Sequence, residues 1–258
     1  MAFKIAVLKE TRANERRVAL VPVVADKLTK LGATLAAQTG AGDAVKLPDA
    51  AFKNVHFAAN PQGLVSDADI VLAVQPPSLA AVDAMKEGAI LISFIYAHKE
   101  IELVKKLRDK NITCFAMELV PRITRAQAMD ALSSQAALAG YYGALLGATS
   151  IARMMPMTTF ATGSIRPGTV LVMGVGVAGL SAIATARRIG AKVEGYDVRP
   201  EVKEQVESLG AKFIDTGVDA RGEGGYAREL TAEEKDKIAA VVTKHIQSAD
   251  IIITTAAI

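Results

Sequence analysis

Short apolar runs alternate with amphipathic segments along this chain, and the alternation occurs twice. The apolar runs have the length and the β-branched content of buried strands, and the segments between several of them have helical spacing. Strands separated by about ten helical residues are typical of βαβ units and of a parallel sheet. The predicted strands are residues 4–8, 34–38, 69–74, 89–94, 112–117, 169–173, 192–196, 212–214 and 250–255, and the predicted helices are 21–30, 79–86, 99–110, 178–189, 201–209 and 232–247.

The repeated alternation predicts an α/β protein with two Rossmann-like parallel-sheet domains joined by a long helix. We expect an N-terminal α/β domain over residues 1–130, a linking helix and junction over 131–163, and a second domain over 164–258. The last predicted strand ends three residues before Ile258, where a parallel sheet ordinarily continues into a turn and a covering helix. We therefore expect the sequence to be truncated.

The linking segment could be either a membrane-spanning helix or a buried helix of a globular protein. Residues 131–152 hold no charged side chain for 22 positions, but they include seven Ser, Thr, Gln and Tyr residues and three glycines. A helix that crosses a bilayer is usually more apolar than this. The segment is predicted to be a long buried helix whose small residues allow close packing, and the chain is predicted to span no membrane.

Composition narrows the functional class. Hydrophobic residues make up 51% and charged residues 22% of the chain, which is typical of a globular protein. The net charge of +3 and the absence of long basic runs do not favour nucleic-acid binding. The single cysteine, Cys114, cannot form an internal disulfide, which indicates a reducing compartment. The three scattered histidines have no metal-ligand spacing, and His56 and His245 are expected at the surface.

The strongest motif is the glycine-rich turn Gly174-Val175-Gly176-Val177-Ala178-Gly179, between a predicted strand and a predicted helix. In the dinucleotide fingerprint the first glycine makes a tight turn, the second admits a pyrophosphate and the third allows helix–strand packing. The helix N-terminus offers free N–H groups to the phosphates. Asp197 ends the next strand, 18 residues after Gly179, as the ribose-binding acid should. The sequence predicts dinucleotide binding here.

Two residues bear on which dinucleotide binds. A carboxylate at Asp197 accepts hydrogen bonds from the ribose hydroxyls and repels a 2′-phosphate, which favours NAD over NADP. Arg199, two positions later, could instead favour a phosphate or stack on adenine. Both alternatives for Arg199 stay open.

A polar cluster follows the predicted strand 112–117, at the edge where open α/β sheets bind ligands. Arg122, Gln127 and Asp130 supply a cation, an amide and an anion within nine residues. Such a set can hold a carboxamide and ribose hydroxyls, but a helix-capping loop has the same spacing. Further along, residues 215–230 contain four glycines and no apolar periodicity, which predicts a mobile loop.

Several of these segments resemble one family. Lys9-Glu10-Thr11 with residues 15–22 resembles the N-terminal signature shared by alanine dehydrogenases and the α subunit of proton-translocating NAD(P) transhydrogenase. Residues 122–135, 174–186, 197–199, 204–210 and 224–227 resemble the transhydrogenase specifically. The resemblance covers essentially the whole chain, and the family's sequence continues past Ile258. It therefore also implies that the N-terminal domain lacks a closing C-terminal segment.

The resemblance implies a role for each matching residue. Arg122, Gln127, Asp130 and Ser133 would hold the nicotinamide end at the reacting centre, and Val177 would meet the pyrophosphate. The full set implied to bind NAD(H), in the cleft between the domains, is Gly174, Gly176, Val177, Gly179, Asp197, Val198, Arg199, Gly225, Tyr226 and Ala257, with Gly225 and Tyr226 on the mobile loop.

The implied function is that of the NAD(H)-binding component of a transhydrogenase, which is active only with its partner subunits. It would pass a hydride directly between NADH and NADP⁺ held on a partner domain, a step that needs positioning more than an acid or base. The implied assembly is a homodimer docked on a membrane-spanning domain and an NADP(H)-binding domain. The implied location is the cytoplasmic side of a bacterial inner membrane, or the matrix side of a mitochondrial one.

Two alternatives remain: a dehydrogenase of the alanine type, and a non-catalytic NAD-binding module. In alanine dehydrogenases a lysine and an arginine hold the keto acid, and a histidine lies at the substrate site. The arginine and the histidine match Arg17 and His98, although His98 could equally begin a helix. The lysine position holds Gln75, which carries no charge.

Overall fold

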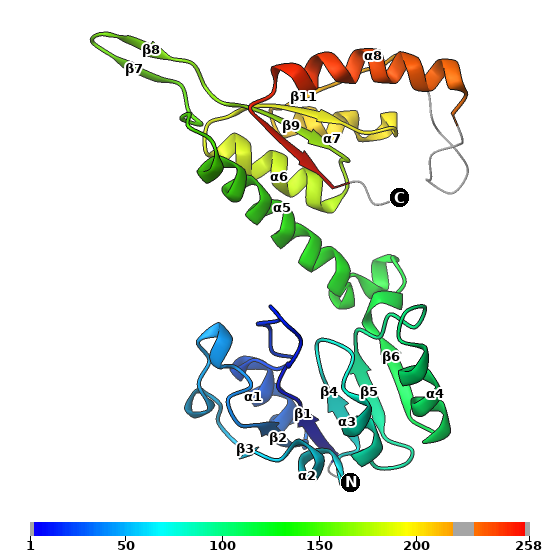
Figure 1. Ribbon diagram of the computed structural model, residues 1–258. Coiled ribbons are helices and arrows are strands. Elements are labelled where there is room, and N and C mark those ends of the chain that lie inside the picture. Colours follow the sequence, from blue (N-terminus) through cyan, green and yellow to red (C-terminus); the bar gives the residue numbers. More distant parts are fainter. Residues whose placement is uncertain (1–2, 219–229, 256–258) are drawn as a thin grey trace. The chain divides into compact units, whose positions relative to one another are not determined.

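A six-stranded parallel sheet organises the N-terminal half of the protein in the computed structural model, which describes residues 3–218 and 230–255 (Figure 1). The strand order β3-β2-β1-β4-β5-β6 is that of a doubly wound sheet, with the order reversing between β1 and β4. The strands are β1 (Lys4–Val7), β2 (Thr34–Gln38), β3 (Val55–Ala58), β4 (Ile70–Leu72), β5 (Ile90–Ser93) and β6 (Thr113–Ala116).

Both faces of this sheet are covered, which explains why its central strands are almost continuously apolar. In β1, Ala6 packs into one buried cluster with Val71 and Leu91, whereas Ile5 and Val7 pack into a second cluster on the opposite face. Ser78 caps the N-terminus of α3 by accepting a hydrogen bond from the Ala81 amide. The helices are α1 (Pro22–Lys30), α2 (Pro61–Val65), α3 (Leu79–Ala84) and α4 (Ile101–Asp109), with short 3-10 turns η1 (Asp43–Val45), η2 (Asp49–Ala51), η3 (Met117–Leu119) and η4 (Thr124–Met129).

The chain divides into two units, residues 1–131 and 132–258. In the second unit four parallel strands follow the order β11-β10-β9-β12, and the separate pair β7-β8 is antiparallel. The elements are α5 (Ala131–Ser150), β7 (Thr158–Phe160), β8 (Gly163–Ile165), β9 (Thr169–Met173), α6 (Val177–Arg188), β10 (Lys192–Tyr196), η5 (Pro200–Val202), α7 (Lys203–Ser208), β11 (Lys212–Phe213), α8 (Ala232–Ser248) and β12 (Ile251–Thr254).

Helices cover the two faces of the second sheet. Ala182 and Ile183 of α6 pack on Val170 and Val172 of β9, and Ala144 of α5 joins the same buried cluster. On the other face, Val242 of α8 packs with Leu171 and Tyr196. Helix α8 begins at a capping box, in which Thr231 and Glu234 accept hydrogen bonds from each other's backbone amides.

The predicted α/β class with two Rossmann-like parallel sheets is confirmed, and most strands lie within two residues of their predicted bounds. Strand β3, helix α2 and the hairpin β7–β8 were not predicted from the sequence. Strand β3 is a sheet edge with the half-polar sequence Val-His-Phe-Ala, and α2 is only five residues long. In β7 and β8 nearly every residue is exposed, so no apolar pattern indicates them.

The prediction that the linking segment is a long buried helix is wrong about its burial. Helix α5 forms, but Gly140 and Ala144 are its only buried residues. The apolar side chains of α5 lie all round the helix rather than on one face, so packing on α6 covers only one stripe. Four large side chains are at least half exposed, namely Leu138, Tyr141, Tyr142 and Leu146. Among the described residues, moreover, we find no helix with both the length and the apolarity needed to cross a bilayer.

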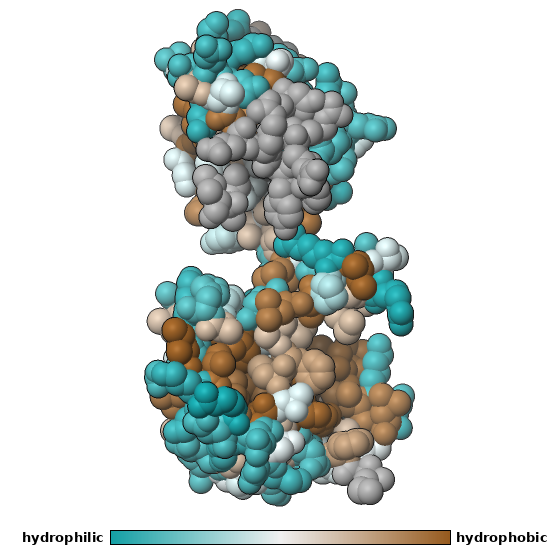
Figure 2. Space-filling model, turned by 90° about the vertical axis from the view of Figure 1, so that its right-hand side faces the viewer, coloured by the Kyte–Doolittle hydropathy of each residue, from teal (hydrophilic) through white to brown (hydrophobic). Residues whose placement is uncertain are grey.

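The first unit also exposes apolar side chains. Figure 2 shows apolar residues gathered on one face of residues 1–131. Strand β6 is an edge of its sheet, and Phe115 on it is 56% exposed. The segment after β6 exposes Leu119, Ile123 and Met129. A cluster of this kind is typical of a surface that packs against another segment or protein.

The contact of α5 with α6 gives a testable prediction about stability. A Cβ at Gly140 would lie 2.0 Å from the backbone oxygen of Ala178, whereas a Cβ at Gly143 would meet nothing closer than 3.8 Å. Gly140→Ala should therefore lower the free energy of unfolding by about 1–3 kcal/mol, because backbone must move. Gly143→Ala should be neutral or stabilising by up to about 1 kcal/mol, since alanine favours helix. Urea unfolding of both variants would show the contrast, and equal effects would contradict this packing.

Candidate functional site

The turn after β9 has the local geometry of a dinucleotide-binding turn. Gly174 follows the strand with a φ of +89°, a conformation that favours glycine. Gly176 is the N-cap of α6 and makes no side-chain cap, so side-chain capping does not satisfy the N–H groups of the first turn. Val177, the first residue of α6, is 45% exposed at this end. These N–H groups and the positive end of the helix dipole suit an anionic ligand.

The glycines of the turn are required for different reasons. A Cβ at Gly179 would lie 1.9 Å from the Gly174 carbonyl oxygen, so the helix could not approach the strand with any larger residue. A Cβ at Gly176 would lie in open space, with no side chain or distant backbone of the described residues within 4 Å. Packing among the described residues therefore does not require glycine at position 176, and the open space leaves the backbone there accessible to a ligand.

Asp197 joins the end of β10 to this turn. Its Oδ2 accepts a hydrogen bond from the Val175 amide at 2.7 Å, and its Oδ1 accepts one from the Arg199 amide at 2.9 Å. The Arg199 guanidinium donates from Nε to Oδ1 at 3.0 Å and from Nη2 to Oδ2 at 3.1 Å. Burial acts to raise the pKa of Asp197, but these hydrogen bonds outweigh it and hold the pKa below its usual value. The carboxylate is therefore charged at neutral pH.

Two further described residues lie at the same end of the sheet. Thr255, which follows β12, donates from its hydroxyl to the Gly174 carbonyl oxygen at 2.8 Å. Val198 is half-buried and packs against the cluster around Leu171. Gly174, Gly176, Val177, Gly179, Asp197, Val198 and Arg199 thus all lie on or beside the turn. Gly225, Tyr226, Ala257 and most of the predicted mobile loop lie outside the described residues.

The second predicted cluster lies on short local structure. Arg122 is exposed in the segment before η4, Gln127 is exposed within η4, and half-buried Asp130 ends it. Ser133 is half-buried in the first turn of α5. Arg122, Gln127 and Asp130 fall in the first unit and Ser133 in the second. Their shared role stays a prediction.

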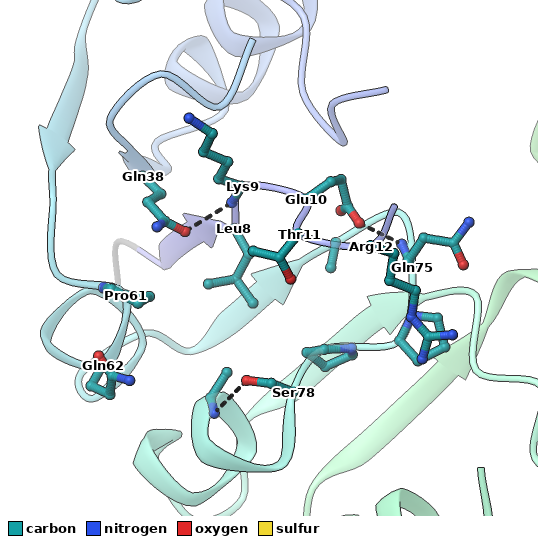
Figure 3. Close-up of a pocket in the computed structure, with 14 residues that line it drawn as sticks. Leu8, Lys9, Glu10, Thr11, Arg12, Gln38, Pro61, Gln62, Gln75 and Ser78 are labelled. Carbon is teal, nitrogen blue, oxygen red and sulfur yellow. Dashed lines mark hydrogen bonds between the residues drawn. The ribbon is translucent and has the colours of Figure 1, made fainter. Parts of the chain in front are cut away.

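A separate pocket lies in the first unit, at the carboxyl ends of β1 and β4 (Figure 3). Glu10 accepts hydrogen bonds from the Val74 and Gln75 amides, at 2.6 and 3.1 Å. On the opposite wall, the Lys9 amide donates to Oε1 of Gln38 at 3.1 Å. The order of strands reverses between β1 and β4, which is where doubly wound sheets bind ligands.

Arg17 lies beside this pocket but is paired within the protein. Glu15 accepts from the Arg17 guanidinium at 2.8 Å (Nε) and 2.6 Å (Nη2), and Gln75 donates to the same carboxylate at 2.7 Å. The hydrogen bond with Arg17 is the largest influence that lowers the pKa of Glu15, to about 2. Arg17 also lies 5.9 Å from the ring centre of Phe94. An internal carboxylate thus holds the cation that a substrate carboxylate would need.

The structural roles of Glu10 and Glu15 could not be predicted from a local pattern, because the partners of Glu10 lie more than 60 residues away in the sequence. His245 corrects another expectation. It is not an isolated surface residue, since its Nδ1 lies 2.6 Å from the buried Glu194 carboxylate on β10. This contact between His245 and Glu194 links α8 to the sheet. His98 is exposed in the turn before α4, and His56 is exposed on β3.

Comparison with known proteins places this geometry in a family. The N-terminal domain of the alanine dehydrogenase/PNT family matches residues 6–139, and its C-terminal domain matches residues 143–258. The chain belongs to the alanine dehydrogenase/PNT family. It is 46% identical over 267 residues to the first part of NAD(P) transhydrogenase subunit alpha from Rhodospirillum rubrum, a match that covers 99% of this chain and 70% of that protein.

Other members of the alanine dehydrogenase/PNT family give the same result. The structure of a transhydrogenase from Sinorhizobium meliloti matches with a TM-score of 0.86 and 39% identity, over 99% of this chain and 70% of that one. The alanine dehydrogenase of Mycobacterium tuberculosis is 28% identical, over 93% of this chain and 64% of that protein. The predicted family resemblance, with transhydrogenase α subunits and with alanine dehydrogenases, is confirmed.

The Glu15–Arg17 pair predicts a pH dependence of stability. A depressed carboxyl pKa contributes stability that is present above the unfolded value of about 4.5 and is lost as the pH falls toward 2. At pH 7, Glu15→Gln should lower the free energy of unfolding by about 1–2 kcal/mol, discounted because Arg17 is partly exposed. Urea unfolding should show the difference from the parent shrinking between pH 4.5 and pH 2.5.

The exposed pair of Glu102 with Lys105 on α4 supplies the control. Glu102→Gln should change stability by less than about 0.5 kcal/mol at either pH, because exposed pairs contribute little. A Glu15→Gln effect as small as that of Glu102→Gln would show that the Glu15–Arg17 pair does not stabilise the first unit.

Proposed function

We propose that this chain is the NAD(H)-binding component of a proton-translocating transhydrogenase, active with its partner subunits. The observation that carries the proposal is the turn Gly174–Val177 with the Asp197 carboxylate beside it. Homology to transhydrogenase α subunits supports the reaction class. The alternative of a non-catalytic NAD-binding module shares this turn and differs only in lacking hydride transfer.

The residues present fit a dinucleotide. The backbone at Gly176 has room for a pyrophosphate, the start of α6 supplies N–H groups, and Asp197 supplies acceptors for ribose hydroxyls. NAD(H), when bound, supplies the hydride that the reaction moves. The negative charge of Asp197 repels a 2′-phosphate, so we expect NADH to bind at least about tenfold more tightly than NADPH.

Arg122, Gln127, Asp130 and Ser133 are proposed to position the nicotinamide end. A cation, amide, carboxylate and hydroxyl can orient a carboxamide and ribose without transferring a proton. Hydride transfer from carbon to carbon needs this orientation and the exclusion of water more than a general acid or base. NADP(H) is proposed to bind on a partner domain, and proton translocation to occur in a separate membrane-spanning domain.

A homodimer is proposed for the same assembly. The hairpin β7–β8 projects from its unit in Figure 1, and Met157, Phe160 and Ile165 near it are exposed. A lone two-stranded hairpin is marginally stable in water, so a second copy that covers it would stabilise it. The exposed side of α5 supports the same proposal. We propose that the complex lies on the cytoplasmic side of a bacterial inner membrane, or on the matrix side of a mitochondrial one, because the family resemblance implies it.

Binding of NADH to two glycine variants tests the function. Gly176→Ala should leave the thermal midpoint nearly unchanged, because its Cβ would meet none of the described side chains, yet weaken NADH binding about tenfold or more as a methyl group blocks the pyrophosphate. Gly179→Ala should instead lower the thermal midpoint, because its Cβ meets the Gly174 oxygen. Calorimetric titration and thermal unfolding measure both. Unchanged NADH affinity in Gly176→Ala would reject the proposed binding site.

Gln127→Asn tests the positioning cluster. With a transhydrogenase NADP(H)-binding subunit added at saturation, the variant should transfer hydride from NADH to an NADP⁺ analogue at least about tenfold more slowly. The affinity for NADH should change little, because contacts at the adenosine end persist. Rapid-mixing absorbance would measure the rate. A rate equal to that of the parent would indicate that the loop only caps a helix, and no transfer by the parent would favour the non-catalytic module.

Alanine dehydrogenase activity is the second candidate, and the first unit argues against it. Gln75 is uncharged and donates its amide to Glu15, so it cannot stabilise a developing alkoxide as an ammonium would. Losing such a partner typically costs about 10²–10³ in rate. We expect no measurable oxidation of L-alanine by NAD⁺ in a spectrophotometric assay. Turnover above about one per second would favour the dehydrogenase instead.

A further inference from the structure

The acceptor positions of Asp197 are already filled by the protein. An ionised carboxylate offers about four lone-pair positions. Four donors occupy them: the Val175 amide, the Arg199 amide, and Nε and Nη2 of the Arg199 guanidinium. The Asp197 side chain is only 6% exposed, so the ion pair is shielded from water on that side. A ribose diol that binds Asp197 must displace two of these four donors.

The two amides cannot be the donors that leave. The Val175 amide belongs to the turn that would hold the pyrophosphate, and the Arg199 amide is a backbone group only two residues after Asp197, so neither can move away without moving the main chain. The guanidinium is the donor that can move, because it stands on a long side chain that is 34% exposed. The Arg199 side chain therefore competes with the ribose hydroxyls for the same carboxylate.

We propose that Arg199 is a specificity-determining residue whose guanidinium occupies the ribose acceptors of Asp197 and, once displaced, favours a 2′-phosphate. Arg199 thus acts against the preference for NADH over NADPH that Asp197 creates. A free ribose diol must break the ion pair in order to bind Asp197, and the free energy needed for this lowers its affinity. A phosphate on the 2′ position, by contrast, gains a cation that Arg199 can offer in bidentate geometry. The inference rests on the proposed function, because it requires a dinucleotide at this turn.

Arg199→Met is the direct test, because it removes the charge and the donors but keeps an unbranched side chain and the backbone amide. Calorimetric titration of the full chain should show NADH binding about fivefold more tightly, the net contribution of a partly exposed ion pair. NADPH should bind at least about tenfold more weakly, because its 2′-phosphate then meets Asp197 without a cation. The preference for NADH over NADPH should therefore widen.

Two further variants keep the test decisive. Arg188→Met removes a charge from the far end of α6 and should change both affinities less than about twofold. Arg199→Lys keeps the positive charge but not the bidentate guanidinium. It should therefore retain NADPH binding, while leaving at least one Asp197 acceptor position free for a ribose hydroxyl. Circular dichroism would show whether Arg199→Met folds. If it does not fold, Arg199→Lys takes its place as the test. Unchanged affinities for both NADH and NADPH in Arg199→Lys would then contradict the inference.

The outcomes separate the inference from the function on which it rests. Weaker or unchanged NADH binding in Arg199→Met, with the parent binding NADH normally, would overturn the role of Arg199 and indicate a contact with adenine instead. Failure of the parent chain to bind NADH would overturn the proposed function itself. Tighter NADH binding together with weaker NADPH binding is the result that the structure predicts.

Discussion

The second unit depends on one interaction for its candidate site, the hydrogen bond from the Val175 amide to the Asp197 carboxylate. This bond ties the turn after β9 to the residue that follows β10. Gly174 and Gly179 allow the turn and α6 to come close enough for it to form. The same carboxylate is the group that would recognise a ribose. Substituting Asp197 would therefore disturb the turn as well as ribose recognition. Substituting the Arg199 side chain, by contrast, leaves in place the hydrogen bonds that the Val175 and Arg199 amides donate to Asp197.

Carboxylates serve the same purpose at strand ends in the first unit. Glu10 accepts from the amides that follow β4, and Glu118 accepts from the Ile95 and Tyr96 amides that follow β5. Backbone N–H groups at the carboxyl end of a parallel strand have no ladder partner, and leaving them unpaired in a buried place would be costly. Glu15 then neutralises Arg17. In the first unit, internal carboxylates thus pair with the strand-end amides and with Arg17.

The sequence was sufficient to predict the parts of the fold that follow a local pattern of apolar residues and glycines. Buried strands such as β9 and β10 and the start of α6 follow from apolar runs and glycines, and their predicted bounds agree closely with the structure. Strand β3 and the hairpin β7–β8 carry no such pattern. The exposure of α5 could not be predicted either, because its uniform apolarity does not show which stripe meets α6. The contacts of Glu10, Glu15 and Glu194 join distant segments, so they become visible only in the fold.

The most direct test of the account is an amide NMR titration of the chain with NADH, since it reports where the nucleotide lies. The amides of Gly176, Val177 and Arg199 should shift in proportion to occupancy, whereas those of Leu8, Lys9 and Gln75 around the first-unit pocket should stay in place. Shifts confined to the first-unit pocket, with Gly176 and Arg199 unchanged, would contradict the central claim that the β9 turn and Asp197 form the nucleotide site.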